Sequence, residues 1–238
     1  MQKNLTSFAR FKAPLGQAEL KPTLILLGAA LLLTLHRYLG SIEFATRAFP
    51  SASRFEATAF MFAAAQLLMG LVPLAIIIFI FREPLQDYGL KIGDWKFGLA
   101  ATAILFPIIA CLMLYPASQT GEIKAFYPFD QSAGESVALF LRLELWRGVL
   151  FYTAWEFFFR GFMLFGLRRS VGDWLAICIQ TIPSCLWHIG MPTGEIISSI
   201  PGGILFGLLA LRTGSILWPL LLHYLIGIGL DFFIVITS

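Results

Sequence analysis

The chain of 238 residues is 58% hydrophobic and only 13% charged, with a net charge of +3. A water-soluble domain averages about 25% charged residues, so this composition excludes an ordinary soluble protein and suits a surface that faces lipid. The sequence has no basic patch interleaved with aromatic residues and no glycine-rich phosphate loop, which argues against nucleic acid and nucleotides as partners.

Seven apolar segments approach the ~20 residues that a membrane-spanning helix needs. The fourth could begin earlier, near Val137, as an interfacial helix or as an eighth span. We therefore predict an all-α, polytopic transmembrane helical bundle of about seven spans, forming one membrane-embedded domain over residues 1–238. The predicted spans cover residues 23–41, 57–81, 97–116, 146–167, 174–190, 195–212 and 215–236.

The N-terminal segment 1–22 is polar and basic, and it is too long and too charged for a cleaved signal peptide. Lysine and arginine collect in the cytoplasmic loops of membrane proteins. A cytoplasmic N-terminus puts twice as many of these residues in the inner segments as in the outer ones, and seven spans then leave the C-terminus outside. The longest outer connection is 118–136. The basic residues assigned to the outer side are Arg47, Arg54, Lys124, Arg142 and Arg147.

Glu156 and Arg160 are two of the few ionisable residues inside an apolar segment. A charge at the bilayer centre costs ~2.5–3.5 kcal/mol, so a buried charge usually has a partner or a function. The two residues are four apart, which puts them on one helix face, where each offsets the charge of the other. The pair is therefore either a structural lock within the fourth span or part of a functional site.

Two histidines and two further carboxylates lie in or between the last three predicted spans. His188 is near the end of the fifth span, and Glu195 opens the sixth, where a carboxylate also suits the positive end of the helix dipole. His223 lies inside the last span, and Asp231 follows two turns later. Each residue alone has a structural explanation: packing for a histidine, and capping for Glu195.

Glu156 is twelve residues, or ~18 Å of helix, from the inner Arg168, and His223 is eight residues, or ~12 Å, from Ser215, at 1.5 Å per residue. Both are therefore expected at interior depth, where one carboxylate and two imidazoles on three helices suit water activation or metal ligation. Three other membrane-protease chemistries lack their residues. The sequence has no His-Glu-x-x-His motif, no Gly-x-Gly-Asp with a second intramembrane aspartate, and no Gly-x-Ser-Gly before the late histidines.

In these residues the chain resembles the CAAX prenyl protease and bacteriocin-processing family, also called the Abi family, over about residues 146–231. The first motif of that family is two adjacent Glu, three residues and Arg. Glu156 and Arg160 match its second Glu and its Arg, and Gly161 follows as usual. Trp155 stands where the first Glu would be.

The two later motifs of the family match in the histidine alone. The second motif is Phe, three residues and His, which corresponds to His188 with Ser184 in place of the Phe. The third is His, three residues and Asn, which corresponds to His223 with Gly227 in place of the Asn. The order and spacing of the three motifs carry the resemblance.

The resemblance implies a multi-span endopeptidase that cleaves a membrane-associated peptide or lipidated protein substrate in or beside the lipid bilayer. We expect it in the inner (plasma) membrane of a bacterium, with its N-terminus in the cytoplasm. Glu156 would be the general base, with Arg160 orienting it. His188 and His223 would hold the water and stabilise the oxyanion, and the expected supporting residues are Glu195 and Asp231.

The absent first Glu leaves three possibilities: Glu156 takes its role, Glu195 supplies a second carboxylate, or catalysis is lost. No cofactor is certain, and zinc is open, with Glu156, His188 and His223 as its ligands. Loss of catalysis would make the protein a non-catalytic membrane partner, such as a binding protein of the bacteriocin-immunity type. A proton-coupled transporter is a further alternative, although the polar residues gather in one half of the chain rather than in two matching halves.

Overall fold

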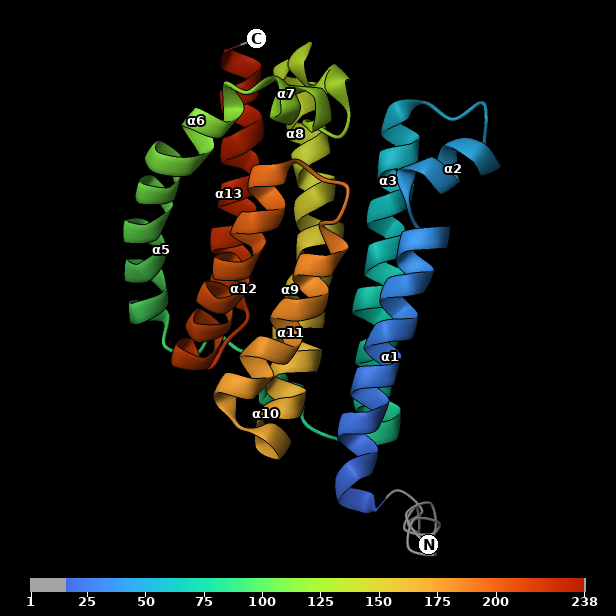
Figure 1. Ribbon diagram of the computed structural model, residues 1–238, viewed down its shortest axis with the longest axis vertical. Coiled ribbons are helices and arrows are strands. Elements are labelled where there is room, and N and C mark those ends of the chain that lie inside the picture. Colours follow the sequence, from blue (N-terminus) through green and yellow to red (C-terminus); the bar gives the residue numbers. More distant parts are fainter. Residues whose placement is uncertain (1–15, 238) are drawn as a thin grey trace, which may run out of the picture.

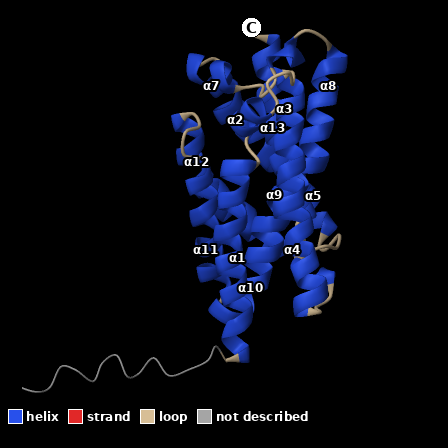
Figure 2. Cartoon of the chain, turned by 90° about the vertical axis from the view of Figure 1, so that its right-hand side faces the viewer, coloured by secondary structure: helices blue, strands red, loops and turns tan. Residues whose placement is uncertain are grey.

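The computed structural model describes residues 16–237, so most of the predicted basic segment 1–22 lies outside the described residues. Every regular element between residues 16 and 237 is a helix, which confirms the all-α prediction. The long helices run side by side along the longest axis of the molecule (Figure 1), and the view from the side agrees (Figure 2).

The N-terminal half consists of one long α-helix, two composite helices and several short ones. Its first elements are α1 (Gln17–Leu39) and α2 (Ile42–Ala48). The first composite helix is made of α3 (Arg54–Ala65), η2 (Gln66–Leu71), α4 (Val72–Ala75) and η3 (Ile76–Phe81). After the short η4 (Leu85–Tyr88), the second is made of α5 (Trp95–Ile109), η5 (Ala110–Leu114) and α6 (Tyr115–Ser118). The connection that follows carries α7 (Gly121–Phe126) and η6 (Gln131–Gly134).

The C-terminal half begins with one continuous helix over residues 137–171, which we name the central helix. It is made of α8 (Val137–Trp146), η7 (Arg147–Tyr152), α9 (Thr153–Glu156), η8 (Phe157–Phe165) and α10 (Gly166–Val171). Two of these stretches, η7 and η8, are π-helical. In a π-helix each backbone N–H bonds the carbonyl oxygen five residues earlier in the chain, rather than four as in an α-helix. The remaining helices are α11 (Asp173–Trp187), α12 (Thr193–Thr213) and α13 (Leu217–Ile236).

Within residues 16–237, five helices are long and apolar enough to cross a membrane. They correspond to the first, second, third, sixth and seventh predicted spans. The fourth predicted span carries the charges of Glu156 and Arg160, and α11 has only 15 residues, about 22 Å of helix where a bilayer core is about 30 Å thick. The count of seven therefore stays a prediction. The five helices are Glu19–Leu39, Arg54–Phe81, Trp95–Ser118, Thr193–Thr213 and Leu217–Ile236.

The central helix forms the interior of the bundle. All its side chains from Ala154 to Leu167 are buried, as expected of a helix that is covered on every side. Its η8 stretch packs against α11 and α12, and its η7 stretch against α3 and α13. The helix begins at Val137, which agrees with the earlier start near Val137 that the sequence analysis offered for the fourth span.

Close packing of α11 against α12 sets the positions of the residues at their shared end. A Cβ atom at Gly203 would lie 2.8 Å from the side chain of Thr181, so only glycine allows this approach. Gln180 also donates from Nε2 to the carbonyl oxygen of Gly203, at 2.9 Å. The two helices are joined by a short turn after Trp187, which brings the end of α11 and the start of α12 together.

The connection over residues 119–136, which we name the 119–136 segment, is folded onto the ends of three helices. Oε1 of Glu122 accepts hydrogen bonds from the backbone N–H and the hydroxyl of Thr193, at 2.8 and 3.2 Å. Nε of Arg54 donates to the carbonyl oxygen of Phe129 at 2.8 Å, and Nζ of Lys124 to that of Thr237 at 2.9 Å. The segment therefore covers the end of the bundle that α7 and α8 share with the C-terminus (Figure 1).

Candidate active site

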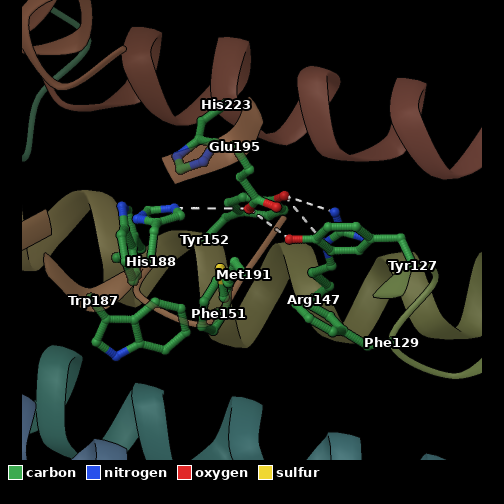
Figure 3. Close-up of a pocket in the computed structure, with 11 residues that line it drawn as sticks. Tyr127, Phe129, Arg147, Phe151, Tyr152, Trp187, His188, Met191, Glu195 and His223 are labelled. Carbon is green, nitrogen blue, oxygen red and sulfur yellow. Dashed lines mark hydrogen bonds and ion pairs between the residues drawn. The ribbon is translucent and has the colours of Figure 1, made fainter. Parts of the chain in front are cut away.

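A cavity of about 40 Å³ lies between the central helix, the start of α12 and the 119–136 segment. It can hold at least one water molecule. Aromatic side chains form most of its wall, and two histidines and a carboxylate reach it (Figure 3). The lining residues are Tyr127, Phe129, Arg147, Phe151, Tyr152, Trp155, Trp187, His188, Met191, Glu195 and His223.

His188 ends α11 and turns one ring nitrogen towards the cavity. Its Nδ1 lies 2.7 Å from the carbonyl oxygen of Ser184. That oxygen can only accept, so Nδ1 carries the proton, and Nε2 of the neutral ring keeps a free lone pair. Nε2 lies 3.9 Å from Oε1 of Glu195. The site thus pairs an unprotonated imidazole nitrogen with a carboxylate.

His223 is held from behind by Glu156. Its Nδ1 lies 2.6 Å from Oε1 of Glu156, and Nη1 of Arg160 donates to the same oxygen at 3.2 Å. The predicted ion pair of Glu156 and Arg160 is therefore confirmed. Glu156 is fully buried and is not among the residues that line the cavity. Its carboxylate fixes the tautomer and the orientation of His223, so that Nε2 is again the unprotonated nitrogen.

Glu195 is the carboxylate inside the cavity. The hydroxyl of Tyr127 donates to its Oε1 at 2.6 Å, and its Oε2 is buried with no hydrogen-bond partner among the described residues. Burial and the negative charge of Glu195 raise the pKa of Tyr127 well above its usual value, so this hydroxyl stays protonated and donates. The carboxylate bonds a tyrosine across the cavity rather than capping the backbone of α12 (Figure 3).

Trp155, which replaces the first Glu of the family motif, lines the cavity between the two histidines. Its ring centroid is 5.5 Å from that of His188 and 6.4 Å from that of His223. The carboxylate beside His188 comes instead from Glu195 on α12. The structure thus brings Glu195, His188 and His223 to one cavity, with Glu156 and Arg160 directly behind it.

Arg147, which the sequence analysis counts on the outer side at the edge of the fourth predicted span, is a buried residue of the site. It lies inside the central helix and is 2% exposed. Two buried carboxylates offset its charge, since its Nη1 donates to Oδ2 of Asp231 at 2.5 Å and to Oε1 of Glu144 at 3.2 Å. Its Nε and Nη2 donate to the hydroxyl of Tyr152, at 3.2 and 2.9 Å. Asp231 therefore meets the cavity only through Arg147.

Gly227, which replaces the Asn of the third family motif, faces the same pair. A Cβ atom built there would overlap the hydroxyl of Tyr152 and would lie 2.6 Å from Nη2 of Arg147. Sequence reasoning had no signal for this contact, because Arg147 and Tyr152 are five residues apart. That spacing aligns two side chains in a π-helix but not in an α-helix.

The described residues do not fit a metal centre. Between residues 16 and 237, no three His, Cys, Asp or Glu side chains gather in a way that could hold an ion. Nδ1 of each cavity histidine and Oε1 of Glu195 are engaged by protein partners, whereas Nε2 of both histidines is unprotonated. Zinc stays a prediction.

Residues 139–228 match the family model described as type II CAAX prenyl endopeptidase, Rce1-like. The resemblance drawn from the sequence is confirmed. The matched region contains the cavity residues of the central helix, α11, α12 and α13, and it ends before Asp231. At the level of the family, the match supports an intramembrane endopeptidase, and together with five apolar helices it supports an integral membrane protein. No curated protein and no solved structure is significantly similar to the chain.

Proposed function

We propose that this protein is an intramembrane endopeptidase of CAAX-protease type, which hydrolyses a peptide bond of a membrane-associated or lipidated substrate. The observation that carries the proposal is the cavity itself, where the carboxylate of Glu195 faces the unprotonated Nε2 of His188, with His223 beside them. We further propose that the protein lies in the inner membrane of a bacterium, with its N-terminus in the cytoplasm.

Glu195 is the better candidate for the general base. It lines the cavity, and its Oε2 has no partner among the described residues. Glu156, which the family motif favours, lies behind His223 and shares its Oε1 with Arg160 and the imidazole. The geometry thus supports Glu195 as the residue that accepts the proton, and Glu156 as the residue that orients His223.

The reaction that follows from these roles is a general-base hydrolysis. A water molecule hydrogen-bonded to Nε2 of His188 gives one proton to Glu195, and its oxygen attacks the carbonyl carbon of the peptide. The π electron pair moves onto the carbonyl oxygen. When the C=O bond reforms, the C–N bond breaks and the amine nitrogen takes the proton from Glu195, giving a carboxylic acid and an amine. Positioned proton transfer of this kind accelerates a reaction by ~10²–10⁴-fold.

Substrate entry requires the 119–136 segment to move. A pocket for a ligand of ordinary size has about 300–1,000 Å³, whereas this cavity has about 40 Å³. Tyr127 and Phe129 of the segment form part of its wall, and the bonds of Glu122 and Tyr127 to the first turn of α12 hold the segment in place. The cavity as described is therefore too small for a peptide substrate.

The test compares new peptide termini by mass spectrometry in membranes that hold equal amounts of the wild type or of Glu195→Gln. The near-isosteric change removes the base and keeps the volume of the side chain. Glu135→Gln is the control, because Glu135 is exposed and does not line the cavity. Termini that appear with the wild type and with Glu135→Gln, but not with Glu195→Gln, would support the proposal. Identical profiles for all three would contradict it.

A non-catalytic binding protein is the second candidate, because Trp155 fills the position of the family's first Glu. It predicts that a cellular phenotype of the wild type, such as immunity to a bacteriocin, survives both Glu195→Gln and Glu156→Gln. Loss of the phenotype in Glu195→Gln, at unchanged abundance in the membrane, would exclude this candidate.

A further inference from the structure

Hydrolysis at this cavity needs a hydrogen-bond donor for the oxyanion, and the two histidines have none to spare. A neutral imidazole has one N–H. His188 uses it on the carbonyl oxygen of Ser184, and His223 uses it on Glu156. The hydroxyl of Tyr127 is likewise engaged by Glu195. The donor that stabilises the transition state must therefore come from another residue of the cavity wall.

Tyr152 presents such a donor. Its hydroxyl oxygen accepts two hydrogen bonds from Arg147, from Nε at 3.2 Å and from Nη2 at 2.9 Å. In the described part of the chain this hydroxyl acts as an acceptor, and it donates to no protein group. The side chain lines the cavity, and its ring stands edge-on to that of His223, with the centroids 4.6 Å apart. The hydroxyl proton is thus free to point into the cavity.

The hydroxyl of Tyr152 lies where the Asn side chain of the third family motif would lie. Gly227 stands where the third motif has Asn, one turn after His223. A Cβ atom there would overlap the Tyr152 hydroxyl and approach Nη2 of Arg147 to 2.6 Å. The hydroxyl and the guanidinium together occupy the space that a side chain at position 227 would fill. The missing Asn is therefore matched in space by groups that the central helix supplies.

Arg147 also lines the cavity, but its Nε, Nη1 and Nη2 already donate to Tyr152, Glu144 and Asp231. Two tryptophans are the other side-chain rivals. Trp187 lines the cavity with its ring, but its indole nitrogen points away from Glu195 (Figure 3) and is buried without a partner among the described residues. Trp155 also lines the cavity. Tyr152 differs from both, because its hydroxyl accepts from a guanidinium. Such charge-assisted hydrogen bonds polarise the O–H group and make it a stronger donor.

We propose that Tyr152 is a catalytic residue that donates its hydroxyl hydrogen bond to the oxyanion, with Arg147 as the positioning residue. The inference rests on the proposed function. As the π electron pair moves onto the carbonyl oxygen, the O–H of Tyr152 bonds the growing negative charge and keeps its proton. Glu144 and Asp231 in turn hold Arg147 in place, since both accept from its Nη1.

The experiment measures kcat and KM for the full chain in liposomes. Its substrate is a synthetic peptide spanning a bond whose wild-type-dependent cleavage the comparison of termini has revealed. Tyr152→Phe keeps the ring and removes the donor, so kcat is expected to fall ~10²–10³-fold, as on removal of one oxyanion donor elsewhere. KM should change less than about twofold, because the bond is made only in the transition state.

The matched control is Tyr224→Phe. Tyr224 packs beside Tyr152, with ring centroids 5.8 Å apart, but its hydroxyl donates to the backbone oxygen of Glu144 and it does not line the cavity. Its kcat should stay near that of the wild type. Trp155→Phe tests the rival indole donor, since a kcat loss that this variant shows and Tyr152→Phe does not would assign the oxyanion bond to the indole N–H.

The outcomes separate the inference from the proposed function. Cleavage that depends on Glu195 but proceeds in Tyr152→Phe with the kcat of the wild type would overturn the inference and leave the proposed function standing. A loss that falls on KM alone, or that Trp155→Phe alone produces, would also overturn it. Identical peptide termini in membranes with the wild type and with Glu195→Gln would contradict both the proposed function and the role of Tyr152.

Discussion

The hydroxyl of Tyr127 donates to Oε1 of Glu195 at 2.6 Å, across 68 residues of sequence. The bond joins the 119–136 segment to the first turn of α12, where Glu122 makes a second attachment at Thr193. It also occupies the carboxylate oxygen that lies 3.9 Å from Nε2 of His188. Lifting of the segment would therefore open the cavity and release the candidate base in one movement.

Removal of this bond should loosen the segment. We expect Tyr127→Phe to increase amide hydrogen exchange over residues 119–136 about tenfold, since a hydrogen bond to a charged group contributes about 1.5–3 kcal/mol. Tyr115→Phe is the control, because Tyr115 is half exposed at the end of the second composite helix and does not line the cavity. Unchanged exchange in Tyr127→Phe would mean that other contacts alone hold the segment.

The effects of substituting Glu156 and Arg160, the ion pair behind His223, on the free energy of unfolding should not be additive. Arg160→Met leaves Glu156 buried and without its cationic partner, which should lower the free energy of unfolding by about 3–5 kcal/mol. The double variant Glu156→Gln/Arg160→Met removes both charges and keeps an acceptor for His223, so it should be more stable than Arg160→Met alone. Thermal unfolding in detergent would measure the difference. A double variant no more stable than Arg160→Met would contradict the coupling.

The sequence predicted the parts of the fold that depend on local pattern. Uninterrupted apolar runs predicted the span at 57–81, which the structure extends to Arg54–Phe81. The spacing of four residues predicted the pair of Glu156 and Arg160. The span predicted at 174–190 corresponds to α11, Asp173–Trp187, but the apolar pattern did not indicate that this helix has only 15 residues.

The rest of the site is formed by contacts between residues far apart in the sequence, and the pattern of a single sequence does not predict such contacts. Tyr127 reaches Glu195 from a connection that carried no motif. The sequence did not reveal Arg147 as a site residue, because its partner Asp231 is 84 residues away and its partner Tyr152 is aligned by a π-helical turn. The order and spacing of the motifs, by contrast, were enough to predict that His188 and His223 belong to one site and to indicate the family.

Removal of metal should leave hydrolysis unchanged. Between residues 16 and 237 no group of three His, Cys, Asp or Glu side chains could hold an ion. The proposed roles of Glu195 and His188 also use only a carboxylate and a lone pair. We expect purified protein treated with a chelator to keep its rate on the substrate peptide, and elemental analysis to find zinc well below one ion per chain. Stoichiometric zinc whose removal abolishes the rate, and whose return restores it, would contradict these roles.

Position 227 has no room for a side chain, because Tyr152 and Arg147 already fill the space beside it. Gly227→Ala places a methyl group against the Tyr152 hydroxyl and Nη2 of Arg147. The guanidinium cannot retreat easily, since Asp231 and Glu144 both bond it. Overpacking of this kind costs about 1–3 kcal/mol. We therefore expect a lower unfolding temperature together with a lower kcat, because the methyl group displaces the proposed donor.

Gly202→Ala is the matched control for this substitution. Gly202 also lies within a helix, α12, but nothing stands within 4 Å of a Cβ atom built there. Alanine should be neutral or stabilising at that position by up to about 1 kcal/mol, because it is the better helix former. If Gly227→Ala behaved like Gly202→Ala in both unfolding temperature and kcat, the hydroxyl of Tyr152 and the guanidinium of Arg147 could not be fixed in the space that the family's Asn would fill.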